Sequence, residues 1–330
     1  RYHDVISGDV GAELWAYERI LELDPERSTV LGQFGRALGQ HYGDFERAAE
    51  YMQRAIDADN EFASAANIVW VHLFRGDIEA AARASEKFAE DFPNTFWRHR
   101  GPFFVAYLAG EAEVAWNAAD AWQSDGSAPE RWRSRARLYR SLADAQAGRR
   151  DAALTGLRDG ISRQVRDERW QLAVARTTDL IWLQGVFFGE TAAARDEARR
   201  LLASDWLDRT DDDGSLHFRI VRDAARVGAV SVAEEVHARW RALEPGIDDW
   251  GREEDLEAAG ALLAGARGDF VEATTRLQAL LARDGPRYPP REWPSARRCQ
   301  RCWSFDLARL HEATGDDEQA DRWYRRVLAV

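Results

Sequence analysis

The chain has 330 residues, of which 45% are hydrophobic and 31% are charged, an ordinary composition for a folded globular protein. Its formal net charge of -12 argues against sequence-independent binding to DNA or RNA, because that affinity comes from Lys and Arg side chains that release phosphate counterions. No stretch approaches the roughly 20 uncharged apolar residues of a membrane-spanning helix, so insertion into a bilayer is not expected either.

A glycine recurs along the whole chain, and except at Gly148 it is followed by an acidic or small residue. It stands at Gly8, Gly43, Gly76, Gly110, Gly148, Gly189, Gly228, Gly268 and Gly315. Five residues after each of these glycines stands an alanine, except after Gly8, where Glu13 takes its place. Glycine suits a tight turn between helices because it adopts positive φ without a Cβ clash, and a following alanine lets two helices approach closely. The pattern therefore predicts a series of helical hairpins.

Each glycine is expected to end the first helix of a hairpin and to precede the second. The predicted first helices cover about residues 30–42, 63–75, 102–109, 129–147, 170–188, 215–227, 252–267 and 296–314. Pro25, Pro93 and Pro245 are expected to end second helices, because proline cannot continue a helix. Ser127 is the expected N-cap of the helix that starts near Pro129. No run of alternating β-branched residues calls for a sheet.

Three segments carry a resemblance to a known family. GDFERAAEYMQRAIDADN (43–60), GDIEAAARASEKFAEDFPN (76–94) and FDLARLHEATGDDEQADRWYRRVLAV (305–330) resemble tetratricopeptide repeats. The resemblance implies an all-α fold, an α-solenoid in which about eight to nine hairpins form a right-handed superhelix. It covers residues 1–330 as one solenoid, closest to 34-residue repeats in 1–125 and with longer, divergent repeats in 126–330. The last repeat is also similar to the C-terminal repeat regions of bacterial Ser/Thr kinases and winged-helix regulators.

The resemblance implies that first helices line a concave groove, which binds a protein or peptide partner. Trp122 and Trp240 fall at the packing position between repeats and are expected to be buried, whereas Trp70 is expected on the surface of the groove. Arginines gather on the first helices of the third and fourth hairpins in an otherwise acidic chain. The candidate groove residues are Trp70, Arg98, Arg100, Arg133 and Arg137, and the expected partner is an acidic segment.

The leading hypothesis is a binding scaffold that forms part of a larger bacterial protein and is not an enzyme. The alternative is a ligand-sensing regulatory region of a bacterial signalling protein, such as a kinase, a cyclase or a transcription regulator. The first and last repeats have no covering helix, so a neighbouring segment or a homo-oligomer partner is expected at the ends. A cytoplasmic location is favoured, with the periplasm left open.

Two further motifs contain residue types that can bind metals or form disulfides. Cys299 and Cys302 form the only C-x-x-C, which supplies two of the four ligands that a structural zinc site needs, so packing or a local disulfide is the favoured interpretation. Asp211, Asp212 and Asp213 precede Gly214 but do not fit the spacing of a calcium loop, and Asp213 is instead expected to cap the next helix. The sequence predicts no metal and no cofactor.

Overall fold

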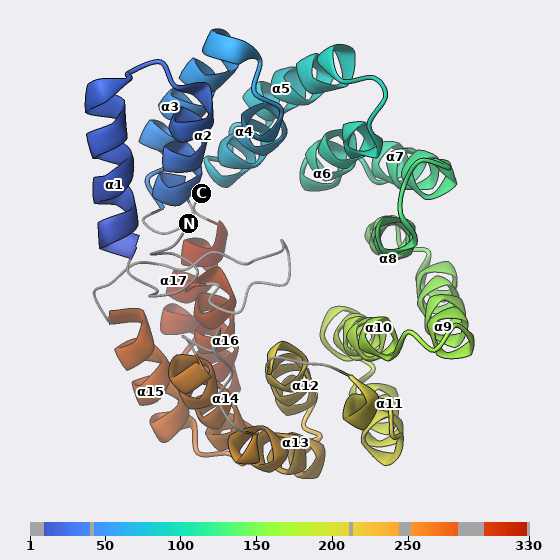
Figure 1. Cartoon of the computed structure of the whole chain (residues 1–330). Coiled ribbons are helices and arrows are strands. Elements are labelled where there is room, and N and C mark those ends of the chain that lie inside the picture. The colour runs from blue at the N-terminus through green and yellow to red at the C-terminus, as the bar shows by residue number, and fades with distance from the viewer. Residues whose placement is uncertain (1–9, 40–42, 211–213, 244–251, 283–299, 329–330) are drawn as a thin grey trace. The chain divides into compact units, whose positions relative to one another are not determined.

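The computed structural model describes residues 10–39, 43–210, 214–243, 252–282 and 300–328. The chain divides into two compact units, the first ending at Ala153 and the second beginning at Leu154. Within the described residues the regular elements are all helices, with no strand (Figure 1). Successive helices form hairpins, so the fold is an all-α solenoid, as the sequence predicts. No helix in these residues is both long enough and apolar enough to span a bilayer.

Unit 1 begins with the second helix of a hairpin and continues with complete hairpins. In each hairpin an even-numbered first helix is followed by an odd-numbered second helix. The elements are α1 (Val10–Leu23), α2 (Ser28–Ala37), α3 (Phe45–Asp59), α4 (Phe62–Phe74), α5 (Ile78–Asp91), η3 (Phe96–His99), α6 (Arg100–Leu108), α7 (Ala112–Ser124) and α8 (Glu130–Gln146).

Unit 2 continues the same alternation, and α9 (Arg150–Arg166) contains the boundary between the units. A π-helical turn, η4 (Leu183–Phe187), extends the first helix α10. The other elements are α10 (Trp170–Trp182), α11 (Thr191–Ala203), η5 (Leu207–Arg209), α12 (Ser215–Arg226), α13 (Val230–Ala242), α14 (Arg252–Ala266), α15 (Phe270–Ala282), α16 (Gln300–Ala313) and α17 (Asp317–Leu328).

The glycines of the repeat are the turns between helices, as predicted. All eight that the structure describes have φ between 64° and 91°: Gly43, Gly76, Gly110, Gly148, Gly189, Gly228, Gly268 and Gly315. In four hairpins the aspartate that follows the glycine caps the second helix, and Asp269 and Asp316 do so by accepting from the N–H of Glu272 at 3.1 Å and of Gln319 at 3.3 Å. Asp44 accepts a hydrogen bond from the backbone N–H of Arg47 at 3.2 Å, and Asp77 accepts one from Ala80 at 2.9 Å. The Gly-Asp dipeptide therefore ends one helix and starts the next.

The alanines five residues after the glycines form the packing seam of each hairpin. Seven of them have no exposed surface: Ala48, Ala81, Ala115, Ala153, Ala194, Ala233 and Ala273. Ala320 is 5% exposed, and Glu13, the exception in sequence, is also buried and accepts a hydrogen bond from Tyr17 at 2.6 Å. Trp122 and Trp240 are buried as predicted, at 0% and 2% exposure.

The observed helix ends follow the predicted ones closely, with one correction at the start of α8. Ser127 is not the N-cap, because its hydroxyl and its backbone N–H both donate to Asp125, at 2.6 Å and 2.9 Å. Pro129 occupies the N-cap position. Helix α1 ends two residues before Pro25 and α5 ends two residues before Pro93, whereas Pro245 lies outside the described residues. The continuity of residues 1–330 as a single solenoid stays a prediction.

Candidate functional site

The first helices of unit 1 lie side by side and form one layer (Figure 1). Gly32 of α2 lies against Ser64 of α4, where an added Cβ would come within 2.3 Å of the serine hydroxyl. The rings of Trp70 on α4 and Phe104 on α6 pack edge to face at 4.5 Å, and Phe104 packs in the same way on Tyr139 of α8 at 4.9 Å. Close backbone approach and aromatic packing therefore join α2, α4, α6 and α8 directly.

Trp70 is a packing residue, so the prediction that it lies on the groove surface is wrong. Only 8% of the residue is exposed. Its ring fills the space between α4 and α6, with Phe104 at its edge and the guanidinium carbon of Arg100 at 4.3 Å from its centroid. The ring thus supports Arg100 and is itself covered.

Arg100 is held between two tryptophans at the start of α6. Its guanidinium carbon lies 4.3 Å from the ring centroid of Trp70 and 5.1 Å from that of Trp97. Cation–π contacts of this kind fix the direction of a long cationic side chain. The adjoining pocket has room for about one water molecule and is lined by Ala66, Val69, Trp70, Ser85, Phe88, Trp97, Arg100 and Gly101.

Arg98 belongs to a polar cluster that ties η3 to the connection between α7 and α8. Its Nη2 lies 3.5 Å from Oδ2 of Asp125, and Nε2 of His99 lies 3.0 Å from the same oxygen. Hydrogen bonds from Ser127 are the main reason why the pKa of Asp125 falls to about 2. Burial lowers the pKa of His99 more than Asp125 raises it. The charge of Arg98 is therefore already balanced by a carboxylate.

Arg133 and Arg137 both bind Glu130, the first residue of α8. Nη2 of Arg133 lies 3.0 Å from Glu130 Oε2, and Arg137 forms an ion pair with the other oxygen. Burial alone would raise the pKa of Glu130, but the two guanidinium groups lower it below its usual value. Arg140 continues the same strip of the helix and binds Asp120 of α7 at 2.9 Å. The strip therefore contacts a second helix at Arg140, and the placement of Arg133 and Arg137 in a groove stays a prediction.

Sequence reasoning missed the other arginine strip of α8. The guanidinium carbons of Arg131 and Arg135 lie 5.8 Å and 4.9 Å from the ring centroid of Trp132. Further along the same strip, Gln146 donates a hydrogen bond to the backbone carbonyl of Tyr107 on α6 at 2.8 Å. We call Arg131 and Arg135 the inner arginine pair, because their strip adjoins a first helix. The spacing of four residues around a tryptophan was the available sequence signal.

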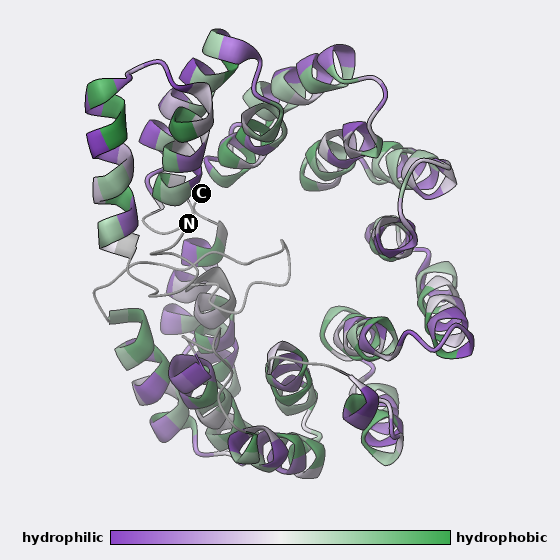
Figure 2. Ribbon diagram, in the orientation of Figure 1, coloured by the Kyte–Doolittle hydropathy of each residue, from purple (hydrophilic) through white to green (hydrophobic). Residues whose placement is uncertain are grey.

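Charge is segregated between the two kinds of helix in unit 1. The first helices carry Arg36, Arg100, Arg131, Arg133, Arg135, Arg137 and Arg140, against only Glu130 and Asp144. The second helices carry an excess of acidic residues over five basic ones, Arg19, Arg47, Arg54, Arg83 and Lys87; the acidic residues are Glu13, Glu18, Glu22, Glu46, Glu50, Asp57, Asp59, Glu79, Glu86, Glu90, Asp91, Glu113 and Asp120. Glu130 pairs with Arg133 and Arg137, and Asp144 pairs with Arg149 at 2.7 Å, so both carboxylates of α8 bind arginines other than Arg131. The contrast between apolar α4 and hydrophilic α8 is visible in Figure 2.

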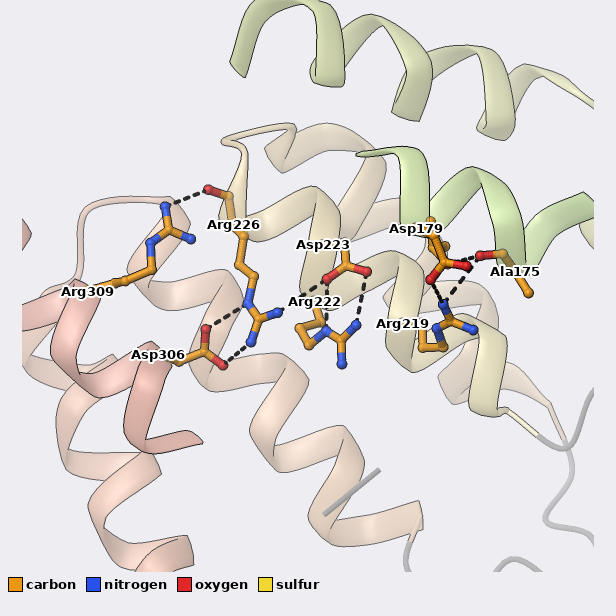
Figure 3. A network of polar contacts seen from close by, with 9 residues as sticks. Ala175, Asp179, Arg219, Arg222, Asp223, Arg226, Asp306 and Arg309 are labelled. Atoms are coloured by element: carbon orange, nitrogen blue, oxygen red, sulfur yellow. Dashed lines mark hydrogen bonds and ion pairs between the residues drawn. The ribbon is translucent and has the colours of Figure 1, made fainter. Parts of the chain in front are cut away.

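Unit 2 carries a second arrangement of charges that sequence reasoning missed (Figure 3). We call it the Arg–Asp ladder, and it consists of Arg176, Asp179, Arg219, Arg222, Asp223, Arg226 and Asp306. Asp179 of α10 pairs with Arg176 on its own helix and with Arg219 of α12, where the Nη2 to Oδ1 distance is 2.6 Å. Arg219, Arg222 and Arg226 recur at intervals of three and four residues, so they share one face of α12.

The ladder ends on α16. Asp223 accepts two hydrogen bonds from Arg222, at 2.8 Å and 3.0 Å, and one from Arg226 at 3.4 Å. Arg226 also donates two bonds of 2.8 Å each to Asp306. Burial opposes the charge on Arg226, but these carboxylates raise its pKa above the usual value. Because 40 and 80 residues separate the paired side chains, no local spacing could have revealed the ladder.

Most of the candidate metal or redox residues lie outside the described part of the chain. Cys299, Asp211, Asp212 and Asp213 are outside the described residues, and Cys302 is in α16 with its side chain undescribed. In the described part of the chain no group of three or more His, Cys, Asp or Glu residues is arranged to hold a metal ion. The absence of zinc, calcium and cofactors stays a prediction.

Comparison with known proteins places the fold. No family model and no curated protein matches the sequence. Among solved structures, a tetratricopeptide repeat protein from Parabacteroides merdae has a TM-score of 0.50 and 14% identity, covering 79% of this chain and 95% of that one. The human IFIT1 dimer with PPP-AAAA has a TM-score of 0.45 and 11% identity, covering 97% and 68%. The APC/C hetero-tetramer Cut9-Hcn1 has a TM-score of 0.40 and 14% identity, covering 83% and 49%.

The protein is a helical repeat protein, because its hairpins turn at glycines, pack through an alanine seam and place their first helices in one layer. The likeness to the Parabacteroides structure identifies the repeat, and the chain has the tetratricopeptide-repeat fold.

Proposed function

We propose that the protein is a binding scaffold for another protein and that the first-helix layer of unit 1 holds an acidic segment of that partner. The observation that carries the proposal is the segregation of charge in unit 1, where arginines gather on first helices and carboxylates on second helices. In a chain with a net charge of -12, such a band attracts an acidic segment to one face and repels it elsewhere. The proposal assigns no catalytic role to the chain.

The inner arginine pair and Arg100 are the proposed contacts. Arg131 is exposed and forms no ion pair with any carboxylate that the structure describes, and its guanidinium lies over Trp132. Arg100 has a direction fixed by two tryptophan rings. A guanidinium that an aromatic ring already orients loses less conformational freedom when it binds a carboxylate. Arg98, Arg133 and Arg137 are assigned a secondary role, because carboxylates of this chain already bind them.

The test compares two double variants that remove the same charge from the same helix. The probe is a fluorescein-labelled decapeptide of glutamate, and its binding to the full chain is followed by fluorescence anisotropy. Arg131→Gln with Arg135→Gln is expected to weaken binding by about 1 to 2 kcal/mol, since two contacts to carboxylates are lost. Arg133→Gln with Arg137→Gln is the matched control and is expected to change binding by less than about 0.5 kcal/mol.

Salt and peptide charge provide the remaining controls. Affinity for the glutamate peptide is expected to fall between about 50 and 300 mM salt, because the screening length shortens from roughly 14 Å to roughly 6 Å over this range. A decapeptide of lysine is expected not to bind. Equal affinity for both peptides, or binding that neither double variant weakens, would reject the acidic partner. Circular dichroism of each variant checks that the helices are intact.

A further inference from the structure

The ladder of unit 2 contains one contact that joins hairpins that are not neighbours. Arg226 ends α12, the first helix of one hairpin, and Asp306 lies on α16, the first helix of the second hairpin after it. The complete hairpin α14–α15 separates them in sequence. Their side chains are nevertheless joined by two hydrogen bonds of 2.8 Å each, in the planar fork-to-carboxylate geometry of a strong ion pair (Figure 3).

The Arg226–Asp306 pair is buried, and Arg309 and Phe305 of α16 contact Arg226. Side-chain exposure is 6% for Arg226 and 3% for Asp306. Arg309, one turn after Asp306, donates a hydrogen bond of 3.2 Å to the backbone carbonyl of Arg226. The guanidinium carbons of Arg226 and Arg309 lie 5.6 Å and 6.0 Å from the ring centroid of Phe305. Charge, backbone and ring contacts therefore all join the end of α12 to the middle of α16.

Small residues in the intervening hairpin α14–α15 allow α12 and α16 to come close together. Helix α14 has small residues along its second half, in the run Ala258-Ala259-Gly260-Ala261 and again at Gly265. A Cβ at position 265 would come within 2.6 Å of Cδ2 of Leu310 on α16. Leu310 follows Asp306 by four residues, so both project from one face of α16. The absence of a side chain at Gly265 thus lets α16 lie close to α14 and reach α12.

In a helical repeat array each repeat ordinarily contacts only its neighbours, so hairpins that are not adjacent are coupled only through the repeat between them. We propose that Arg226 and Asp306 form a latch that couples the last hairpin, α16–α17, to α12 and makes the end of unit 2 open as one block. Removing the charge of Asp306 leaves the buried guanidinium of Arg226 with only its 3.4 Å contact to Asp223, so the loss of the pair is expected to be strongly destabilising. This inference does not depend on what unit 1 binds.

Hydrogen exchange of the full chain, measured by mass spectrometry, tests the latch. Asp306→Asn keeps the shape of the side chain and removes its charge. It is expected to speed exchange by at least about tenfold both in α16–α17 and in the last turns of α12, because the two regions open together. Arg226→Lys keeps the charge but loses the two-pronged contact, and a smaller rise is expected in the same two regions.

The matched control is Glu234→Gln, which breaks an ion pair between adjacent hairpins. Arg267 binds Glu234 at 2.6 Å, with the two side chains 56% and 42% exposed. Exchange is expected to change by less than about twofold, as for other exposed pairs. If Asp306→Asn does not fold, the hydrogen exchange of the Arg226→Lys variant alone tests the latch. Faster exchange in α16–α17 without any change in α12, or no change in either region, would overturn the latch.

Discussion

Position around the helix, and not the number of arginines, determines what an arginine of α8 does. Arg133 and Arg137 both bind the carboxylate of Glu130, and Arg140 on the same face of the helix binds Asp120 of α7. The inner arginine pair lies on the other side, over Trp132. Two residues along a helix turn a side chain by about 200°, so alternate arginines point to opposite sides. The same residue type therefore has a structural role on one strip and a proposed binding role on the other.

Gly214 provides the sharpest prediction at the scale of one residue. Its φ is +93°, and an added Cβ would come within 2.3 Å of Nε1 of Trp240, which is buried. Gly214→Ala therefore combines backbone strain with a clash against a ring that cannot move, and we expect a loss of about 3 kcal/mol or more in the free energy of unfolding. Urea denaturation measures the loss.

Gly228→Ala is the control for Gly214→Ala. Gly228 has a φ of +72°, but no atom lies within 4 Å of its added Cβ. Only the backbone strain remains, and the expected loss is about 1 to 2 kcal/mol. If the two variants lose the same stability, the contact with Trp240 contributes nothing and strain alone explains both.

At the scale of elements, the sequence contains most of what decides the hairpins. A glycine and an alanine at fixed spacing are local requirements of a turn and of a close helix contact, so they predict helix ends and seam residues from one chain. The sequence does not predict which side of a first helix faces a partner, because that depends on which neighbouring helix covers each side. Trp70 illustrates the difference, since its place on α4 was predicted correctly whereas its burial depends on Phe104 and Arg100 of another hairpin.

The packing seam gives a prediction for a whole hairpin. Ala115 of α7 is completely buried, whereas its neighbour Val114 is 52% exposed. Ala115→Trp is expected to destabilise unit 1 by about 3 kcal/mol or more, because a large ring has no space between closely packed helices. Val114→Trp introduces the same side chain at the neighbouring, exposed position of the same helix and is expected to change stability by less than about 0.5 kcal/mol. Thermal unfolding that ranks the two variants equally would show that the seam does not run through Ala115.

At the scale of the whole molecule, the two units use arginine in opposite ways. In unit 1 Arg131 is exposed and forms no ion pair with a described carboxylate, and most acidic side chains are on second helices. In unit 2 the arginines of α12 are bound to Asp179, Asp223 and Asp306. Paired and buried charges fix a structure, whereas an unneutralised charge attracts a partner. This contrast is the reason why we propose partner binding for unit 1 and coupling between hairpins for unit 2.

The histidines predict how the stability of the whole molecule depends on pH. Burial is the main cause that lowers the pKa of His72, His99 and His237 below the usual value of 6.5. As pH falls through 6.5, the unfolded chain takes up protons that the folded chain does not, so stability is present above this pH and is lost below it. Asp125, with a pKa of about 2, and Glu130 lose their stabilising effect only in a more acidic range, as pH falls below their unfolded values of 3.8 and 4.5. The urea midpoint is therefore expected to be lower at about pH 5.5 than at about pH 7.5, and replacing the three histidines with glutamine is expected to reduce the difference. An equal or higher midpoint at the lower pH would contradict the assignment of neutral, buried histidines.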